Sequence, residues 1–179
     1  MVEDVRRMVV GYLLVATIVV VVMAMSERGV AIGDGKTGEE PEVKILEHSW
    51  NYKSSVLSNS GGFRDGLQTS TKIADAMAFR ALRGESLSMA RVDFGPKGLN
   101  PPHKHPNATE VLYVLQGSLL VGFIQTVNNT LFQQVLSNGD LFVFPRSLVH
   151  YQLNMDINKP AMTLSAFNSA IPGISQTAN

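Results

Sequence analysis

The chain has 179 residues, which is long enough for one domain with a substantial core and an additional tail or targeting segment. Its 15 Lys and Arg residues equal its 15 Asp and Glu residues, so the net charge is zero and nucleic acid is not expected as a partner. The sequence contains no cysteine, which excludes disulfides, zinc–thiolate sites, iron–sulfur clusters and thiol catalysis.

Residues 1–26 are predicted to be a targeting segment. Residues 8–25 carry no charge and follow Arg6 and Arg7. This apolar run is longer than the roughly 7–15 residues of most secretory signals and shorter than the roughly 20 residues of a spanning helix. We interpret residues 1–26 as a signal peptide, with an uncleaved signal anchor over 8–25 as the alternative. Its Val- and Ile-rich run lacks the amphipathic pattern of a core helix, and both interpretations predict a non-cytosolic protein.

Residues 27–60 are polar and lack a regular hydrophobic period, so we interpret them as a lead-in to a domain over residues 61–175. His48 and Trp50 lie in this lead-in. An isolated histidine beside an aromatic residue is more often a surface or packing residue than a ligand, and His48 is not counted among the candidate ligands.

Short β-prone stretches between turn signals indicate an all-β domain. Gly, Pro and Asn residues mark turns at 95–98, 116–117, 128–129 and 138–140. The predicted strands cover residues 86–94, 110–115, 118–126, 131–136, 141–144, 149–154 and 161–167. Because no convincing helix separates these strands, their spacing indicates a β-sandwich or a β-barrel.

Three of the four histidines and one carboxylate form a candidate metal site. His103 and His105 are two residues apart, so an extended backbone places both side chains on one face. Glu110 begins the next predicted strand, and His150 comes from a distant strand that joins them only if the sheet closes. These ligand types suit Mn, Fe, Ni, Cu or Zn, and four protein ligands leave octahedral positions open for water or substrate. An H-x-H pair alone would be weak evidence, and the context of Glu110 and His150 strengthens it.

The stretches 97–117 and 139–154 resemble the two cupin motifs in the form found in plant germins and germin-like proteins. The first motif reads G, five residues, H-x-H, three or four residues, E, six residues, G; the second reads G, five residues, P-x-G, two residues, H, three residues, N. The matching residues are His103, His105, Glu110, Gly117, Gly139, Pro145, His150 and Asn154. Lys97 stands in place of the first glycine, and Ser147 replaces the middle glycine of the second motif. The resemblance covers about residues 86–173 and extends more weakly back to Asn51.

This resemblance implies a cupin jelly-roll β-barrel with one manganese ion per chain, held by His103, His105, Glu110 and His150. It also implies secretion to the plant cell wall (the apoplast), a role in the cell wall or in defence, a small-molecule substrate and homo-oligomers up to a hexamer. Members of the family include oxalate oxidases, superoxide dismutases and proteins with no established activity.

Departures from the family pattern modify these expectations. The N-terminal disulfide of germins cannot form without cysteine, and the sequence shows no counterpart of the helical segment that follows their barrel. We therefore expect a dimer or a heterogeneous species in place of a robust hexamer. Oxalate-degrading members place two asparagines in the metal pocket. One matches Asn100, a candidate substrate-pocket residue, and the other falls at Ala90, which has no amide, so oxalate oxidase activity is not expected.

Two functional hypotheses remain open from the sequence. The first is a secreted manganese oxidoreductase, with superoxide dismutation as the expected reaction because superoxide needs only an open metal position. The second is a non-catalytic cell-wall or receptor-like binding protein in which the metal braces the barrel.

Two N-glycosylation sequons, at Asn107 and Asn128, are candidate glycan sites if the chain is secreted. Asn128 lies in a predicted hairpin turn and is the better candidate. Asn107 lies between predicted metal ligands, where a glycan would crowd the pocket mouth.

Overall fold

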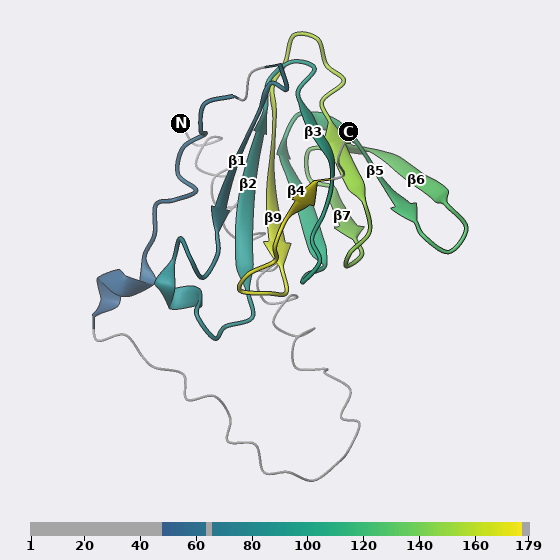
Figure 1. Cartoon of the computed structure of the whole chain (residues 1–179). Helices are drawn as coiled ribbons and strands as arrows, with labels where there is room; N and C mark the ends of the chain where they lie inside the picture. Colours follow the sequence, from purple (N-terminus) through teal and green to yellow (C-terminus); the bar gives the residue numbers. More distant parts are fainter. Residues whose placement is uncertain (1–47, 64–65, 177–179) are drawn as a thin grey trace.

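A computed structural model describes residues 48–63 and 66–176, and its strands form two antiparallel five-stranded sheets (Figure 1). The elements in chain order are η1 (Ser49–Tyr52), β1 (Thr69–Ala74), η2 (Arg80–Leu82), β2 (Ser88–Phe94), β3 (Leu99–Lys104), β4 (Glu110–Gln116), β5 (Ser118–Gln125), β6 (Thr130–Ser137), β7 (Leu141–Phe144), β8 (His150–Leu153), β9 (Ala161–Phe167) and β10 (Ser175–Gln176). In this part of the chain the helical elements are the short 3-10 turns η1 and η2, so the predicted all-β class is confirmed.

The predicted targeting segment 1–26 and residues 27–47 of the lead-in lie outside the described residues. Across 48–63 and 66–176, no helix is long and apolar enough to span a bilayer. The described end of the lead-in is attached to the sheet by Arg91 of β2, whose guanidinium donates hydrogen bonds to the carbonyls of Leu57 and Ser58. His48 is exposed and stacks on Trp50. The boundary between lead-in and domain stays a prediction.

The strand order brings distant parts of the sequence together. One sheet has the order β1-β2-β9-β4-β7 and the other β10-β3-β8-β5-β6. Strand β9 inserts between β2 and β4, and β8 inserts between β3 and β5. These crossovers between two facing antiparallel sheets are the jelly-roll arrangement. As a result, β3 and β8 of one sheet face β4 and β9 of the other across a shared interior.

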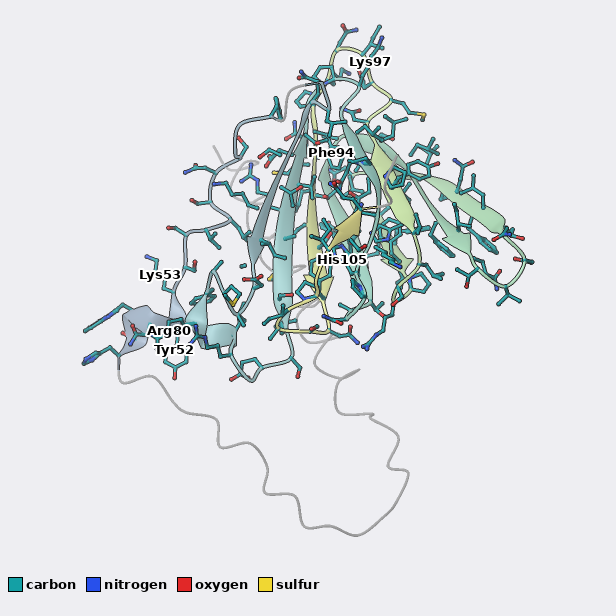
Figure 2. The ribbon with its side chains drawn as sticks, viewed as in Figure 1. Tyr52, Lys53, Arg80, Phe94, Lys97 and His105 are labelled. Carbon is teal, nitrogen blue, oxygen red and sulfur yellow. The ribbon has the colours of Figure 1, made fainter. Side chains whose placement is uncertain are left out.

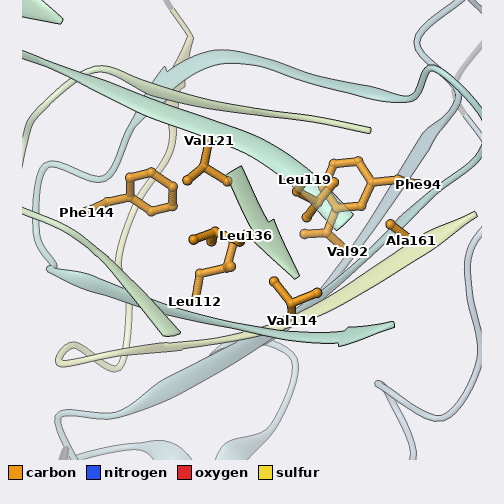
Figure 3. Close-up of a cluster of buried hydrophobic side chains, with 9 residues drawn as sticks. All are labelled: Val92, Phe94, Leu112, Val114, Leu119, Val121, Leu136, Phe144 and Ala161. Carbon is orange, nitrogen blue, oxygen red and sulfur yellow. The ribbon is translucent and has the colours of Figure 1, made fainter. Parts of the chain in front are cut away.

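A hydrophobic cluster occupies part of this interior (Figure 3). Its nine buried members come from both sheets: Val92, Phe94, Leu112, Val114, Leu119, Val121, Leu136, Phe144 and Ala161. The alternation of β2 explains the pattern, because every second residue from Ser88 to Phe94 is buried. The cluster fixes the spacing of the two sheets and hence the positions of the polar side chains beside it.

Strands β1 and β10 were not among the predicted strands, and for β3 only an extended stretch around His103 and His105 was expected. Pro101 and Pro102 lie within β3, and proline is poorly compatible with a regular ladder because it has no backbone donor. The structure accommodates them with an irregularity in the β3–β8 register between Asn100 and His103. The pairing resumes at His103, which lies directly opposite His150.

The two residues that replace glycines of the cupin motifs, Lys97 and Ser147, both adopt left-handed backbone conformations. Lys97 has a φ of 57° and Ser147 a φ of 63°. For residues with a side chain this conformation costs roughly 1–2 kcal/mol. Ser147 offsets the cost with two hydrogen bonds, from its amide to the carbonyl of His105 and from its hydroxyl to the carbonyl of Pro106. A glycine would also supply the amide, so the substitution adds only the hydroxyl bond between the His150 loop and the loop that carries His105.

Candidate metal centre

The structure brings together the four side chains that the sequence proposed as ligands. His103 lies near the end of β3, and His105 is the first residue after that strand. Glu110 begins β4, and His150 begins β8. All four are buried, and one ligand atom from each lies within 4.8 Å of the others. Figure 2 shows His105 beside the short strand β10, well separated from Phe94 toward the other end of the sandwich.

Backbone carbonyls orient the three imidazole rings. The Nδ1 atoms of His103, His105 and His150 lie 2.8, 2.6 and 2.9 Å from the carbonyl oxygens of Pro101, Gly173 and Leu148. A carbonyl oxygen can only accept, so each Nδ1 must carry a proton. In the neutral rings the lone pair is therefore on Nε2. This arrangement of the second nitrogen is typical of histidine ligands to metals.

Three acceptor atoms lie close together at Glu110: its own Oε2 and the Nε2 atoms of His105 and His150. Oε2 of Glu110 lies 3.3 Å from Nε2 of His105 and 3.2 Å from Nε2 of His150. With neutral imidazoles, these contacts would place lone pairs against a carboxylate in a buried environment. Such an arrangement is unfavourable unless a cation lies among them, either a proton or a metal ion.

The pKa shifts describe how the residues respond when the cation is a proton. Burial opposes protonation of His105, but the hydrogen bond and charge of Glu110 outweigh it and raise its pKa. Burial also opposes ionisation of Glu110, yet hydrogen bonds from His105 and His150 hold the pKa of this carboxyl well below its usual range. Burial, followed by the charge of His150, lowers the pKa of His103 to about 4. His103 is thus neutral at neutral pH, as a metal ligand must be.

A hydrogen-bond chain holds the second oxygen of Glu110. Oε1 accepts a 2.6 Å hydrogen bond from Oγ of Ser165 and a longer one, 3.4 Å, from Nε2 of Gln152. Oε1 of Gln152 in turn accepts from Nδ2 of Asn100 at 2.8 Å. Oε1 is therefore occupied by donors, and Oε2 is left to face the three histidines.

A cavity of about 290 Å³ opens beside the four ligands. Asn100, the predicted substrate-pocket residue, and Ala90 both line it. The amide nitrogen of Asn100 is already engaged with Gln152, and Ala90 presents only a methyl group. The segment after β9 closes one side, with Gly173 serving both as cavity wall and as the acceptor for His105.

The two sequons differ in their surroundings. Asn128 is exposed in the β5–β6 hairpin, where its side-chain oxygen accepts from the amide of Thr130. The side chain of Asn107 donates to the carbonyl of Ile171, beside the segment that borders the cavity. Glycosylation at both positions stays a prediction, with Asn128 the less encumbered.

A family model described as Cupin matches residues 65–179. Germin-like protein subfamily 2 member 4 of Arabidopsis thaliana is 46% identical over 143 residues, which cover 78% of this chain and 62% of that protein. Germin-like protein 8-12 of Oryza sativa subsp. japonica is 48% identical over 100 residues, which cover 56% of this chain and 45% of that protein. The chain therefore spans about half of the length of these relatives.

Similar folds occur among solved structures. A recombinant oxalate oxidase in complex with glycolate aligns with a TM-score of 0.69 and 33% identity, over 83% of this chain and 73% of that one. Peruvianin-I, described as a cysteine peptidase from Thevetia peruviana latex, aligns with a TM-score of 0.70 and 26% identity, over 84% and 90%. Thiol chemistry cannot carry over to this chain, which contains no cysteine.

Proposed function

The chain belongs to the cupin family as a germin-like protein, and from this premise we propose that it binds manganese and dismutates superoxide after secretion to the plant cell wall. The observation that supports a metal ion is the contact of Glu110 Oε2 with the Nε2 atoms of His105 and His150. The Nδ1 atoms of both rings already donate to backbone carbonyls, so both Nε2 atoms are acceptors in the neutral rings. A divalent cation at this point satisfies all three acceptors at once. The three nitrogens and one oxygen fit manganese among other divalent metals.

When bound, manganese would supply one-electron redox chemistry and an open coordination position. The residues of the chain supply the conditions for it. His103, His105 and His150 are held as neutral Nε2 donors, and Ser165 and Gln152 hold Glu110 so that Oε2 faces the site. Superoxide is small enough to reach the site through the adjoining cavity and needs no further recognition.

Oxalate oxidation is not part of the proposal. The cavity wall at Ala90 offers no hydrogen bond to a second carboxylate, and the amide of Asn100 is already engaged with Gln152. Robust release of hydrogen peroxide from oxalate by the metal-loaded protein would show that this reasoning is wrong. Ala90→Asn is the partner variant for that assay.

The first test measures metal. Elemental analysis and EPR of the secreted protein should find about one manganese ion per chain, and His103→Ala, His105→Ala, Glu110→Ala and His150→Ala should each lose most of it. His48→Ala is the matched control, because His48 is exposed and outside the site. Retention of stoichiometric metal by all four variants after dialysis would contradict the metal site.

The second test measures superoxide dismutation by the metal-loaded protein. Activity that disappears together with the metal in the four variants would support the enzyme. A protein that keeps its metal without dismutating superoxide would instead be the non-catalytic binding protein, with the metal bracing the barrel. We further propose that the chain forms a homo-oligomer, whose size light scattering on the secreted protein would measure.

A further inference from the structure

The cavity beside the metal site is predominantly apolar, which bears on the class of ligand it accepts. Its apolar lining residues come from β1, β2, β9 and the segment before β10: Ile73, Ala90, Val92, Phe167, Ile171, Pro172 and Ile174. Two of them, Ile171 and Ile174, are largely exposed although they are large aliphatic residues. Burial of such side chains against an apolar ligand would be favourable.

The charges in the cavity are equally informative. Among the described residues that line it there is no Lys or Arg, and the carboxylates are Glu110 at the metal site and Asp75 directly after β1. The carboxylate of Asp75 caps a turn by accepting from the amides of Met77 and Ala78. Apart from the metal ligands, the other polar side chains of the lining are uncharged: Thr71, Asn100 and Gln176. A second negative charge on a ligand would therefore have no cation among the described lining residues to compensate it.

The metal site itself admits one anion. Three neutral imidazoles and one carboxylate carry a net charge of −1, so a divalent ion leaves a charge of +1 at the centre. One anionic oxygen on the ligand neutralises that charge. The remainder of the ligand then lies against the apolar wall, where a ring or a branched chain is preferred over a polar group.

We propose that this cavity binds a monoanionic oxygen donor with a compact apolar body, namely an aromatic monocarboxylate or a phenolate. The inference rests on the proposed metal site, which supplies the partner for the anionic oxygen. The volume of about 290 Å³ lies at the small end of ligand pockets, which run from roughly 300 to 1,000 Å³. A single ring therefore matches the cavity better than a larger ligand does.

The experiment titrates the manganese-loaded full chain with three carboxylates, and binding is followed by calorimetry and EPR. Acetate measures the anionic oxygen alone, benzoate adds the apolar ring, and isophthalate adds a second charge to that ring. Benzoate should bind roughly 10–100-fold more tightly than acetate. Isophthalate should bind much more weakly than benzoate, with an affinity closer to that of acetate. Equal affinity of benzoate and acetate would overturn the proposal.

Two isoleucines of matched exposure provide the variants. Ile174 lines the cavity and is 62% exposed, whereas Ile157 lies in the loop between β8 and β9 and is 63% exposed. Ile174→Asn should weaken benzoate severalfold and leave acetate unchanged, and Ile157→Asn should change neither. Ala90→Leu, which fills the cavity from β2, should exclude benzoate more strongly than acetate. Unchanged benzoate affinity in both cavity variants would contradict the assignment.

Metal content, measured before each titration, separates this proposal from the previous one. A chain that binds no manganese refutes the proposed function, whereas a chain that binds manganese but does not prefer benzoate refutes only the present inference. Titration with phenol as a further ligand distinguishes the two kinds of anionic oxygen donor, the phenolate and the aromatic carboxylate. Tighter binding of phenol than of benzoate assigns the site to phenolates, and the reverse assigns it to aromatic carboxylates.

Discussion

The two ends of the sandwich interior differ in chemistry although the same strands build both. On the inner face of β4, Glu110 belongs to the candidate metal site, whereas Leu112 and Val114, two and four residues later, belong to the hydrophobic cluster. On β9 the pairing register places Ser165 opposite Leu112 and Phe167 opposite Glu110. A period of two residues thus fixes which side chains point inward, and the position along the strand decides whether they serve the metal site or the core.

Phe144 marks the boundary between the two ends. It is part of the hydrophobic cluster, and its ring stacks on His150 with centroids 4.3 Å apart. The apolar end therefore supports one ligand directly and holds the sheets around the others. The comparison implies a division of roles, in which the apolar end stabilises the fold and the polar end binds the metal, while the buried His103 makes the metal-free fold sensitive to acid.

The largest expected effect tests the apolar end. Leu112 is completely buried, and Leu112→Ala should lower the free energy of unfolding by about 2–5 kcal/mol because it leaves a cavity in the cluster. Denaturant unfolding measures the change. Leu131→Ala on β6 is the control, since Leu131 is 48% exposed and should cost under about 1 kcal/mol. Similar losses for the two variants would show that the cluster is not the source of stability.

The second prediction tests the polar end through pH. The pKa of His103 falls from 6.5 to about 4 in the folded chain, so between these values only the unfolded chain takes up the proton. The metal-free protein should therefore lose up to roughly 3 kcal/mol of stability as the pH falls from 6.5 to 4. The pKa of His105 is raised, so its contribution to the stability of the fold is fully present below pH 6.5 and is lost only as the pH rises through its pKa in the folded chain. His105 therefore does not offset the loss that His103 causes between pH 6.5 and 4.

Thermal unfolding of the metal-free protein across this pH range measures the effect. His103→Gln should flatten the decline between pH 6.5 and 4, and His48→Gln on the exposed lead-in should leave it unchanged. Below the usual pKa of Glu110 a further loss is expected in both, because its lowered pKa makes protonation unfavourable to the folded state. A decline that persists in full in His103→Gln would refute the assignment to this histidine.

Sequence alone predicted the four ligands but not the groups that orient them. The ligands lie in two local motifs whose spacing can be recognised without knowledge of the fold. Ser165 and the carbonyl of Gly173 reach the site only through the strand order and the pairing of β10 with β3. Gln152 lies two residues after His150 on β8, so the alternation of that strand could have predicted that it faces the site. A serine in a strand, such as Ser165, gives no signal by itself, because most such residues face solvent. Nothing in a local pattern shows that β9 inserts between β2 and β4.

The last prediction compares two hydroxyls on the inner face of β9. Ser165→Ala removes the 2.6 Å donor to Glu110 Oε1 and should reduce manganese affinity about 10–100-fold, as loss of a partner that orients a ligand typically does. The hydroxyl of Thr163, two residues earlier and fully buried, has no hydrogen-bond partner among the described residues. Thr163→Val should therefore stabilise the fold by about 1 kcal/mol and leave manganese affinity unchanged. Metal titration and denaturant unfolding of both variants separate the roles. If Thr163→Val lowered manganese affinity as much as Ser165→Ala, the division between a metal-binding end and a structural end would fail at this strand.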